Sequence, residues 1–251
     1  MEKQKINQLK KETEASSTQA ATSTKRPNPF RILLDDIHER NGERSRKLAR
    51  CQVWLPFSFD EFRKLLVAEG SALLEWKRQR VPFVIDAANE PAIRQLWLYS
   101  TGNRDFEGDL RKGIMLQGKV GCGKSILLES YVNLLDHYID KFELFVVAPL
   151  FITSNRLSQE IVKGEMSRFT IRTLAIDEFG REPKTAMDYG NTIRPLTELF
   201  HLRSDNGSLT HGTTNFTLDT LSGDEFYGRM IGDRLRAMFN FITLAGESRR
   251  Q

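Results

Sequence analysis

The spacing of apolar residues predicts that residues 30–80 are helical. Between residues 58 and 79, apolar side chains recur at intervals of three, four or seven positions, the spacing of an amphipathic helix. They are Phe59, Phe62, Leu66, Leu73 and Trp76. Ser58, followed three positions later by Glu61, forms a capping-box pattern that predicts the start of this helix just after Ser58.

From residue 81 on, short apolar segments alternate with longer segments of helical spacing. We expect strands at 113–118, 144–149, 173–177, 209–215 and 239–246, and helices at 124–139, 155–162, 193–203 and 224–238. Alternation of this kind predicts an α/β fold, in which helices cover both faces of a largely parallel sheet.

Composition separates three regions of the chain. Residues 1–29 are polar and low in complexity, which predicts a disordered tail and linker; a short basic helix at 3–11 that orders on a partner is the alternative. Residues 30–80 form the helical segment, which we expect to bind a partner protein, and residues 81–251 form the α/β core.

Charge and cysteine content narrow the class of protein only slightly. A net charge of +4 over 251 residues permits contact with a polyanion without demanding it. Cys51 and Cys122 match neither a metal-binding nor a disulfide spacing, so we expect a reducing compartment. No apolar stretch opens the chain and no apolar run reaches the length of a membrane span, so we expect a soluble, cytoplasmic protein.

Residues 118–125, GKVGCGKS, match the phosphate-binding pattern G-x-x-x-x-G-K-S between a predicted strand and a predicted helix. In this pattern the glycines allow a tight loop whose amides point at phosphate. Lys124 is expected to reach the β- and γ-phosphates and Ser125 to ligate Mg²⁺, while Cys122 is a small filler. The candidate nucleotide-binding residues are Gly118, Lys119, Val120, Gly121, Cys122, Gly123, Lys124, Ser125 and Ile126.

An acidic pair supplies the second half of this expected site. Asp177 and Glu178 end an apolar strand, and the carboxyl ends of parallel strands meet at the edge where ligands bind. Asp177 is expected to hold Mg²⁺ and Glu178 to act as general base on water. Asn215, with Thr214 as second choice, follows a further strand and is expected to sense the γ-phosphate and position the water.

The acidic pair favours hydrolysis over phosphoryl transfer to a small acceptor. A kinase excludes water and usually carries an arginine-bearing lid, and a GTPase normally carries an N-K-x-D segment, which this sequence lacks. The sequence therefore favours an ATP-hydrolysing enzyme with ATP and Mg²⁺ as ligands.

From residue 81 on, the chain resembles the DnaC/IstB-like branch of the AAA+ ATPases, which contains bacterial replicative-helicase loaders and transposition helper ATPases. The segments that carry the resemblance are GKVGCGKS, LAIDEFG, THGTTNF and the ending GDRLRAMFNFITLAGESRR. The resemblance implies a three-layer AAA+ core with little or no C-terminal lid, preceded by a small helical N-terminal domain. It also implies an ATP-dependent homo-oligomer that holds single-stranded or duplex DNA.

The resemblance also assigns individual residues. Lys124 and Ser125 match the Walker A positions, Asp177 and Glu178 the Walker B pair, and Asn215 the first sensor. Among the arginines near the end of the chain, Arg234 matches the one that reaches a neighbouring subunit's ATP, with Arg229 as the alternative. Arg250 matches a second, sensor-like arginine that contacts the nucleotide. A solvated or DNA-facing basic surface is the alternative for Arg234, Arg236, Arg249 and Arg250.

The segment NRLSQEIVKGEMSRF is where the resemblance implies contacts with DNA. Arg156, Lys163 and Arg168 would bind the phosphate backbone there, and a charged exposed helix and turn is the alternative. The leading hypothesis is a helicase loader whose residues 1–80 bind a replicative helicase. A transposition helper that binds a transposase is the second hypothesis, and a small-molecule P-loop kinase is the third.

Overall fold

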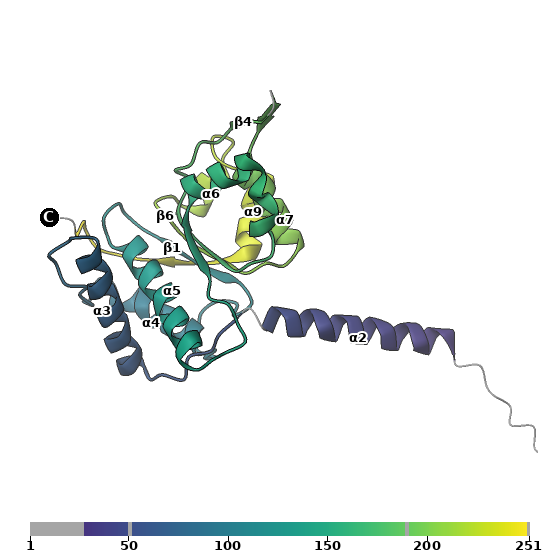
Figure 1. Ribbon diagram of the computed structural model, residues 1–251, viewed down its shortest axis with the longest axis horizontal. Helices are drawn as coiled ribbons and strands as arrows, with labels where there is room; N and C mark the ends of the chain where they lie inside the picture. The colour runs from purple at the N-terminus through teal and green to yellow at the C-terminus, as the bar shows by residue number, and fades with distance from the viewer. Residues whose placement is uncertain (1–27, 50–51, 189–190, 250–251) are drawn as a thin grey trace, which may run out of the picture. The chain divides into compact units, whose positions relative to one another are not determined.

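The computed structural model describes residues 28–49, 52–188 and 191–249 (Figure 1). The chain divides into two compact units, Met1–Arg44 and Ser45–Gln251. The described part of the first unit belongs almost entirely to helix α2 (Pro29–Ala49). Residues 1–27 of the expected tail and Arg250 lie outside the described residues.

The second unit is built on a five-stranded sheet in the order β2-β3-β6-β1-β7, with all neighbours parallel. These strands are β1 (Gly113–Gln117), β2 (Leu150–Thr153), β3 (Leu174–Phe179), β6 (Thr210–Thr214) and β7 (Phe239–Thr243). The α/β fold with a parallel sheet is thus confirmed.

Helices cover both faces of this sheet (Figure 1). On one side lie α3 (Phe59–Trp76), α4 (Glu90–Ser100) and α5 (Lys124–Lys141); on the other lie α6 (Ser154–Glu160), α7 (Pro195–Asp205) and α9 (Arg229–Met238), with α8 (Leu218–Leu221) packed on α9. Successive side chains of β1 point to opposite faces of the sheet. Ile114 and Leu116 pack in the hydrophobic cluster with α3, α4 and α5, and Met115 packs in the cluster with α6, α7 and α9.

Three smaller elements complete the chain. A π-helical turn (Ile161–Glu165) and a 3₁₀ helix (Met166–Phe169) follow α6. Strands β4 (Ala186–Asp188) and β5 (Asn191–Ile193) form an antiparallel pair between β3 and α7 that the sequence analysis did not anticipate. No helix within the described ranges is both long and apolar enough to cross a membrane.

Helix α3 begins where the capping box predicted. Ser58 Oγ accepts a hydrogen bond from Glu61 N, and Glu61 Oε2 accepts one from Ser58 N. Its apolar face is buried against the core: Phe62 and Leu66 are 0 % exposed and share a cluster with Leu127 of α5. The unit that contains the sheet therefore begins earlier than the boundary at residue 81 expected from the sequence.

Two expected elements differ from the structure. The strand predicted at 144–149 lies instead at Leu150–Thr153, because this part of the run pairs with β3, whereas Phe145 is fully exposed to solvent. The helix predicted at 224–238 begins at Arg229, because Gly228 has a φ of 80° that interrupts helical geometry.

Candidate nucleotide site

The loop between β1 and α5 has the backbone of a phosphate cradle. Gly121 and Gly123 have φ values of 84° and 103°, a region that side chains other than glycine rarely adopt. Gly123 is the N-cap of α5, so the unpaired amides of the first helical turn open toward the loop. The glycines at these two positions are therefore required by local geometry.

Lys124 is the first residue of α5, and its side chain contacts the loop. Its Nζ donates hydrogen bonds to the carbonyl oxygens of Gly118 (2.8 Å) and Lys119 (2.7 Å), and the residue is only 6 % exposed. Burial lowers the pKa of Lys124, and the positive charge of Arg181 acts in the same direction. A phosphate group next to Nζ would oppose both effects.

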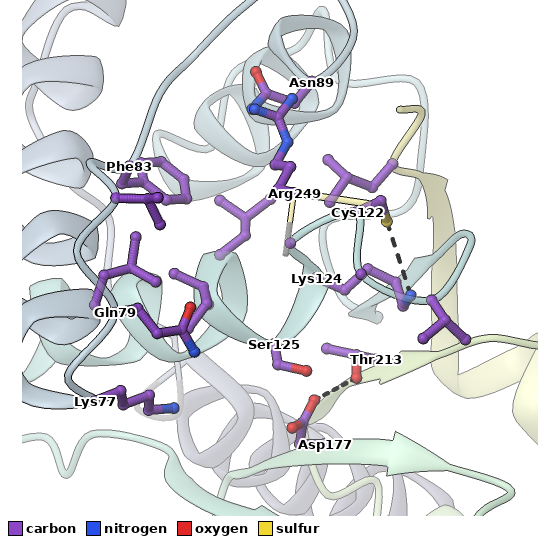
Figure 2. Close-up of a pocket in the computed structure, with 18 of the residues that line it drawn as sticks. Lys77, Gln79, Phe83, Asn89, Cys122, Lys124, Ser125, Asp177, Thr213 and Arg249 are labelled. Atoms are coloured by element: carbon purple, nitrogen blue, oxygen red, sulfur yellow. Dashed lines mark hydrogen bonds between the residues drawn. The ribbon is translucent and has the colours of Figure 1, made fainter. Parts of the chain in front are cut away.

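The acidic pair ends β3 beside this loop. Asp177 is 7 % exposed and its Oδ1 accepts a hydrogen bond of 2.5 Å from Thr213 Oγ1 of β6, as Figure 2 shows. Thr213 Oγ1 in turn accepts a hydrogen bond from Glu178 N (3.0 Å). One threonine thus orients both acidic residues.

Glu178 has a strained backbone. Its φ is 61°, unusual for a residue with a side chain, and the pairing of β3 with β6 is irregular between Ile176 and Phe179. Its carbonyl oxygen accepts hydrogen bonds from Ser154 Oγ (2.8 Å) and Arg181 N (3.1 Å). These bonds hold the carboxylate at the pocket while neighbouring strand residues remain in the core.

The order of the strands places Asn215 close to the phosphate loop and to the acidic pair. Because β6 lies between β1 and β3, a residue that follows β6 lies between the phosphate loop and the acidic pair. Asn215 lines the pocket there, whereas the Thr214 hydroxyl is buried and donates to the carbonyl of Phe179 (3.1 Å). The geometry favours Asn215 over Thr214 for contact with a ligand.

These groups surround a cavity of ≈ 410 Å³. Seven of the nine expected loop residues, 120–126, line it together with Asp177, Glu178 and Asn215. Gly118 and Lys119 do not line the cavity; their carbonyl oxygens accept the hydrogen bonds from Lys124 Nζ. The opposite wall comes from Asn89 and from five residues that follow α3, namely Gln79, Val81, Pro82, Phe83 and Val84 (Figure 2).

The segment after β7 runs over the phosphate loop. Arg249 N donates to Gly121 O (2.9 Å), and a Cβ built on Gly121 would lie 2.3 Å from Ser248 Oγ. The Arg249 side chain lies next to Asn89 at the wall of the pocket, as Figure 2 shows. It forms an ion pair with Asp86 at 2.7 Å. Hydrogen bonding to Arg249 lowers the pKa of Asp86.

Arg249 also offers a free donor. Its Nε is the one buried side-chain polar atom without a hydrogen-bond partner among the residues that the structure describes. The position expected to contact nucleotide was Arg250, which lies outside the described residues. The structure instead brings Arg249 to the pocket.

Other residues named from the sequence lie away from the cavity. Arg234 of α9 pairs with Asp205 of α7 at 2.5 Å and is not part of the lining, and Arg229 is exposed at the start of α9. The three expected DNA-contacting residues lie on and after α6. Of these, Arg156 and Arg168 line a separate concavity of ≈ 360 Å³ next to β2, whereas Lys163 pairs with Glu160 at 3.2 Å.

Sequence reasoning missed Thr213, Arg181 and Arg249. Thr213 lies within the segment THGTTNF, immediately before Thr214 and Asn215, and Arg181 directly follows the segment LAIDEFG. Residue spacing along the chain does not show which way each of these side chains points. Their directions depend on the order of the strands and on the path of the last residues.

The arrangement fits a nucleoside triphosphate with Mg²⁺. The glycine loop and helix start supply amides for phosphate, Lys124 supplies a cation, and a hydroxyl (Ser125) and a carboxylate (Asp177) lie in the same lining. Oxygen ligands of this kind suit Mg²⁺, which proteins hold with few side chains together with substrate phosphates.

Comparisons with known proteins find similarity in structure. No protein-family model matches the sequence, and no curated protein is significantly similar to it. A solved structure of DnaI is 21 % identical, with 82 % of this chain and 100 % of that chain covered at a TM-score of 0.49. The DnaC helicase loader is 18 % identical, with 64 % and 93 % covered and a TM-score of 0.46.

A third similar structure is AMPPCP-bound DnaA from Aquifex aeolicus. It is 18 % identical, with 66 % of this chain and 50 % of that chain covered, at a TM-score of 0.40.

Proposed function

We propose that this protein is an ATPase that assembles on DNA and delivers a replicative helicase to it. The observation that carries the hydrolytic part is that Asp177, Glu178 and Asn215 converge on the phosphate loop from the ends of two strands. An ATP-binding module without hydrolysis would need the loop but not this convergence.

Within the pocket each side chain has a separate task. Lys124 and the first amides of α5 offset the charge of the β- and γ-phosphates. Mg²⁺ held by Ser125 and Asp177 would add positive charge where the phosphate oxygens develop negative charge. Glu178 orients a water molecule and takes up its proton, and Asn215 holds that water from the side of β6.

Arg234 supports a site shared between two copies of the chain. It lies outside the pocket of its own chain, on α9, with its side chain 30 % exposed next to Asp205. We assign it to the pocket of a neighbouring copy, where a guanidinium stabilises charge on the transferring phosphate. Turnover then requires an ATP-dependent homo-oligomer.

Helix α2 supports the docking of a partner protein. Phe30, Leu33, Leu34 and Ile37 follow helical spacing, and between 38 % and 70 % of each residue is exposed. An apolar row of this kind inserts into a groove of another protein. A replicative helicase is the proposed partner; a transposase on the same helix would make the protein a transposition helper.

Arg156, Lys163 and Arg168 support contact with single-stranded DNA. Lys163 and Arg168 pair with Glu160 and Glu165 at 3.2 and 3.3 Å, at positions where both cations are more than half exposed. Exposed pairs of this kind are weak, so phosphates can replace the carboxylates. Binding should then weaken strongly with salt and depend little on sequence.

Mixing two inactive variants tests the proposed ATPase. Glu178→Gln should bind ATP and lose turnover by about 10²-fold or more, the usual contribution of a general base. Arg234→Ala should also bind ATP and lose about 10³-fold, as when an arginine finger is removed. A mixture should recover activity, because some interfaces then pair an intact Glu178 with an intact Arg234.

Lys124→Ala is the control, since it should lose nucleotide binding and give no recovery when mixed with Glu178→Gln, because no pocket in that mixture has both Lys124 and Glu178 intact. Full turnover by the Glu178→Gln variant would remove the proposed base. Full turnover by a strictly monomeric wild-type chain would remove the shared site.

A further inference from the structure

Arg181 lies beside Glu178 in the nucleotide pocket and has no role in the mechanism above. Its Nη1 is 2.9 Å from Glu178 Oε1, and both side chains line the cavity with Lys124 and Asn215. As long as this ion pair persists, one oxygen of the proposed base is bound to a cation rather than to water.

The backbone at this point is held rigidly, so a change can occur only in the side chains. The Glu178 N–H donates a hydrogen bond to Thr213 Oγ1. The Glu178 carbonyl accepts two, from Ser154 Oγ and from Arg181 N. Gly180, between them, has a φ of 85° and donates from its N–H to Glu182 Oε2 and Tyr227 Oη, at 3.0 and 3.1 Å. Both acceptors are buried.

The ion pair itself is weakly held. The side chains of Arg181 and Glu178 are 43 % and 36 % exposed, and only one nitrogen and one oxygen meet. Exposed pairs with a single contact contribute little stability. A phosphate binds a guanidinium through two parallel hydrogen bonds and carries more charge than one carboxylate, so it competes effectively for Arg181.

The charge of Arg181 already acts on the space where phosphates would bind, since it is one of the groups that lower the pKa of Lys124. Two cations from different elements therefore face the same part of the pocket. Burial is the main cause of the lowered pKa of Lys124 and the Asp177 carboxylate opposes it, so the effect of Arg181 is a smaller addition that a terminal phosphate would offset.

We propose that Arg181 is a switch residue acting within its own chain: it binds the Glu178 carboxylate when no triphosphate is present and moves to the terminal phosphate of a bound nucleoside triphosphate. The move leaves Glu178 free to orient water. Arg181 thereby distinguishes a nucleoside triphosphate from a diphosphate, and it positions Glu178 indirectly. This inference rests on the proposed ATPase function.

Nucleotide affinities of the full chain test the proposal. The probes are ADP and the β,γ-methylene analogue of ATP, each with Mg²⁺, measured by calorimetry. Arg181→Gln should weaken binding of the analogue about tenfold, the loss of a charge-assisted hydrogen bond partly offset by the broken ion pair. ADP affinity should stay within about twofold because ADP lacks the phosphate concerned, and Arg181→Lys should recover part of the loss.

A double-mutant comparison isolates the switch. Glu178→Gln removes the carboxylate that competes for Arg181, so this variant should bind the analogue about threefold more tightly than wild type, and Arg181→Gln should abolish that gain. Arg111→Gln is the matched control, because Arg111 pairs with Asp109 at the same 2.9 Å and lies outside the pocket. Both nucleotides should bind this control as they bind wild type.

Two results would overturn the proposal in distinguishable ways. If wild type binds both nucleotides and Arg181→Gln leaves the ratio of their affinities unchanged, Arg181 is a surface ion-pair partner and the ATPase proposal stands. If wild type binds neither nucleotide, the ATPase proposal fails and this inference with it.

Discussion

Acid should destabilise the protein through one buried histidine, His211. The residue is 2 % exposed on β6, and its Nδ1 accepts a hydrogen bond from Ile114 N of β1 at 3.2 Å. The rings of Tyr99 and Tyr131 lie against it, with centroids 5.9 and 6.2 Å away. Protonation at Nδ1 would break this bond and bury a charge between the two strands that lead to the phosphate loop and Asn215.

The size of the effect follows from the proton affinity of the ring. Burial, assisted by the positive charge of Arg203, lowers the pKa of His211 to about 4, from 6.5 for an exposed histidine. The unfolded chain therefore binds the proton more readily, so stability is complete above pH 6.5 and declines as the pH falls toward 4. By pH 5 the free energy of unfolding should have dropped by about 2 kcal/mol from this residue alone.

Urea denaturation at pH 7.5 and pH 5 measures this contribution. His211→Asn replaces the ring with an amide that still offers an acceptor near Ile114 N and does not titrate. We expect the variant to be less stable at pH 7.5 but to lose about 2 kcal/mol less than wild type on going to pH 5. His38→Asn, at an exposed position on α2, should keep the wild-type dependence. Equal losses in wild type and His211→Asn would refute the reasoning.

Three further outcomes follow from the structure. Leu33→Asp should abolish co-purification of the full chain with its helicase or transposase, whereas Glu39→Ala on the opposite face of α2 should not; unchanged recovery in Leu33→Asp would remove α2 as the docking surface. Gly121→Ala should lower the free energy of unfolding by about 1–3 kcal/mol, because φ is 84° and Ser248 occupies the space of the new Cβ; a denaturation midpoint equal to wild type would contradict this. Arg249→Ala should increase proteolytic cleavage of the last residues and weaken ADP binding severalfold, and unchanged values for both would show that the segment does not close the pocket.

Most of the fold could be predicted because it depends on local patterns. The capping box at Ser58 and the alternating apolar segments describe interactions within one helix or strand, so they hold before any tertiary contact forms. The phosphate loop is local in the same sense, since its shape requires glycine at Gly121 and Gly123 whatever surrounds it. Asp177 and Glu178 could be placed at a ligand-binding edge because they follow a buried strand.

The position of β2 could not be predicted in this way. Residues 144–153 form a run of apolar residues with few interruptions, and such a run contains no signal for where a strand begins. Pairing with β3 decides it, through contacts such as Leu150 with Leu174, and leaves Phe145 in solvent.

The amino-acid sequence by itself determined the fold class, the cradle and the acidic pair, since these arise from residue types at fixed spacing. Only the tertiary structure decided that Arg249 lines the pocket, that Arg181 pairs with Glu178, and that α3 belongs to the core. The reason is that a side chain's partner depends on strand order and on the path of distant segments, which spacing along the chain does not record.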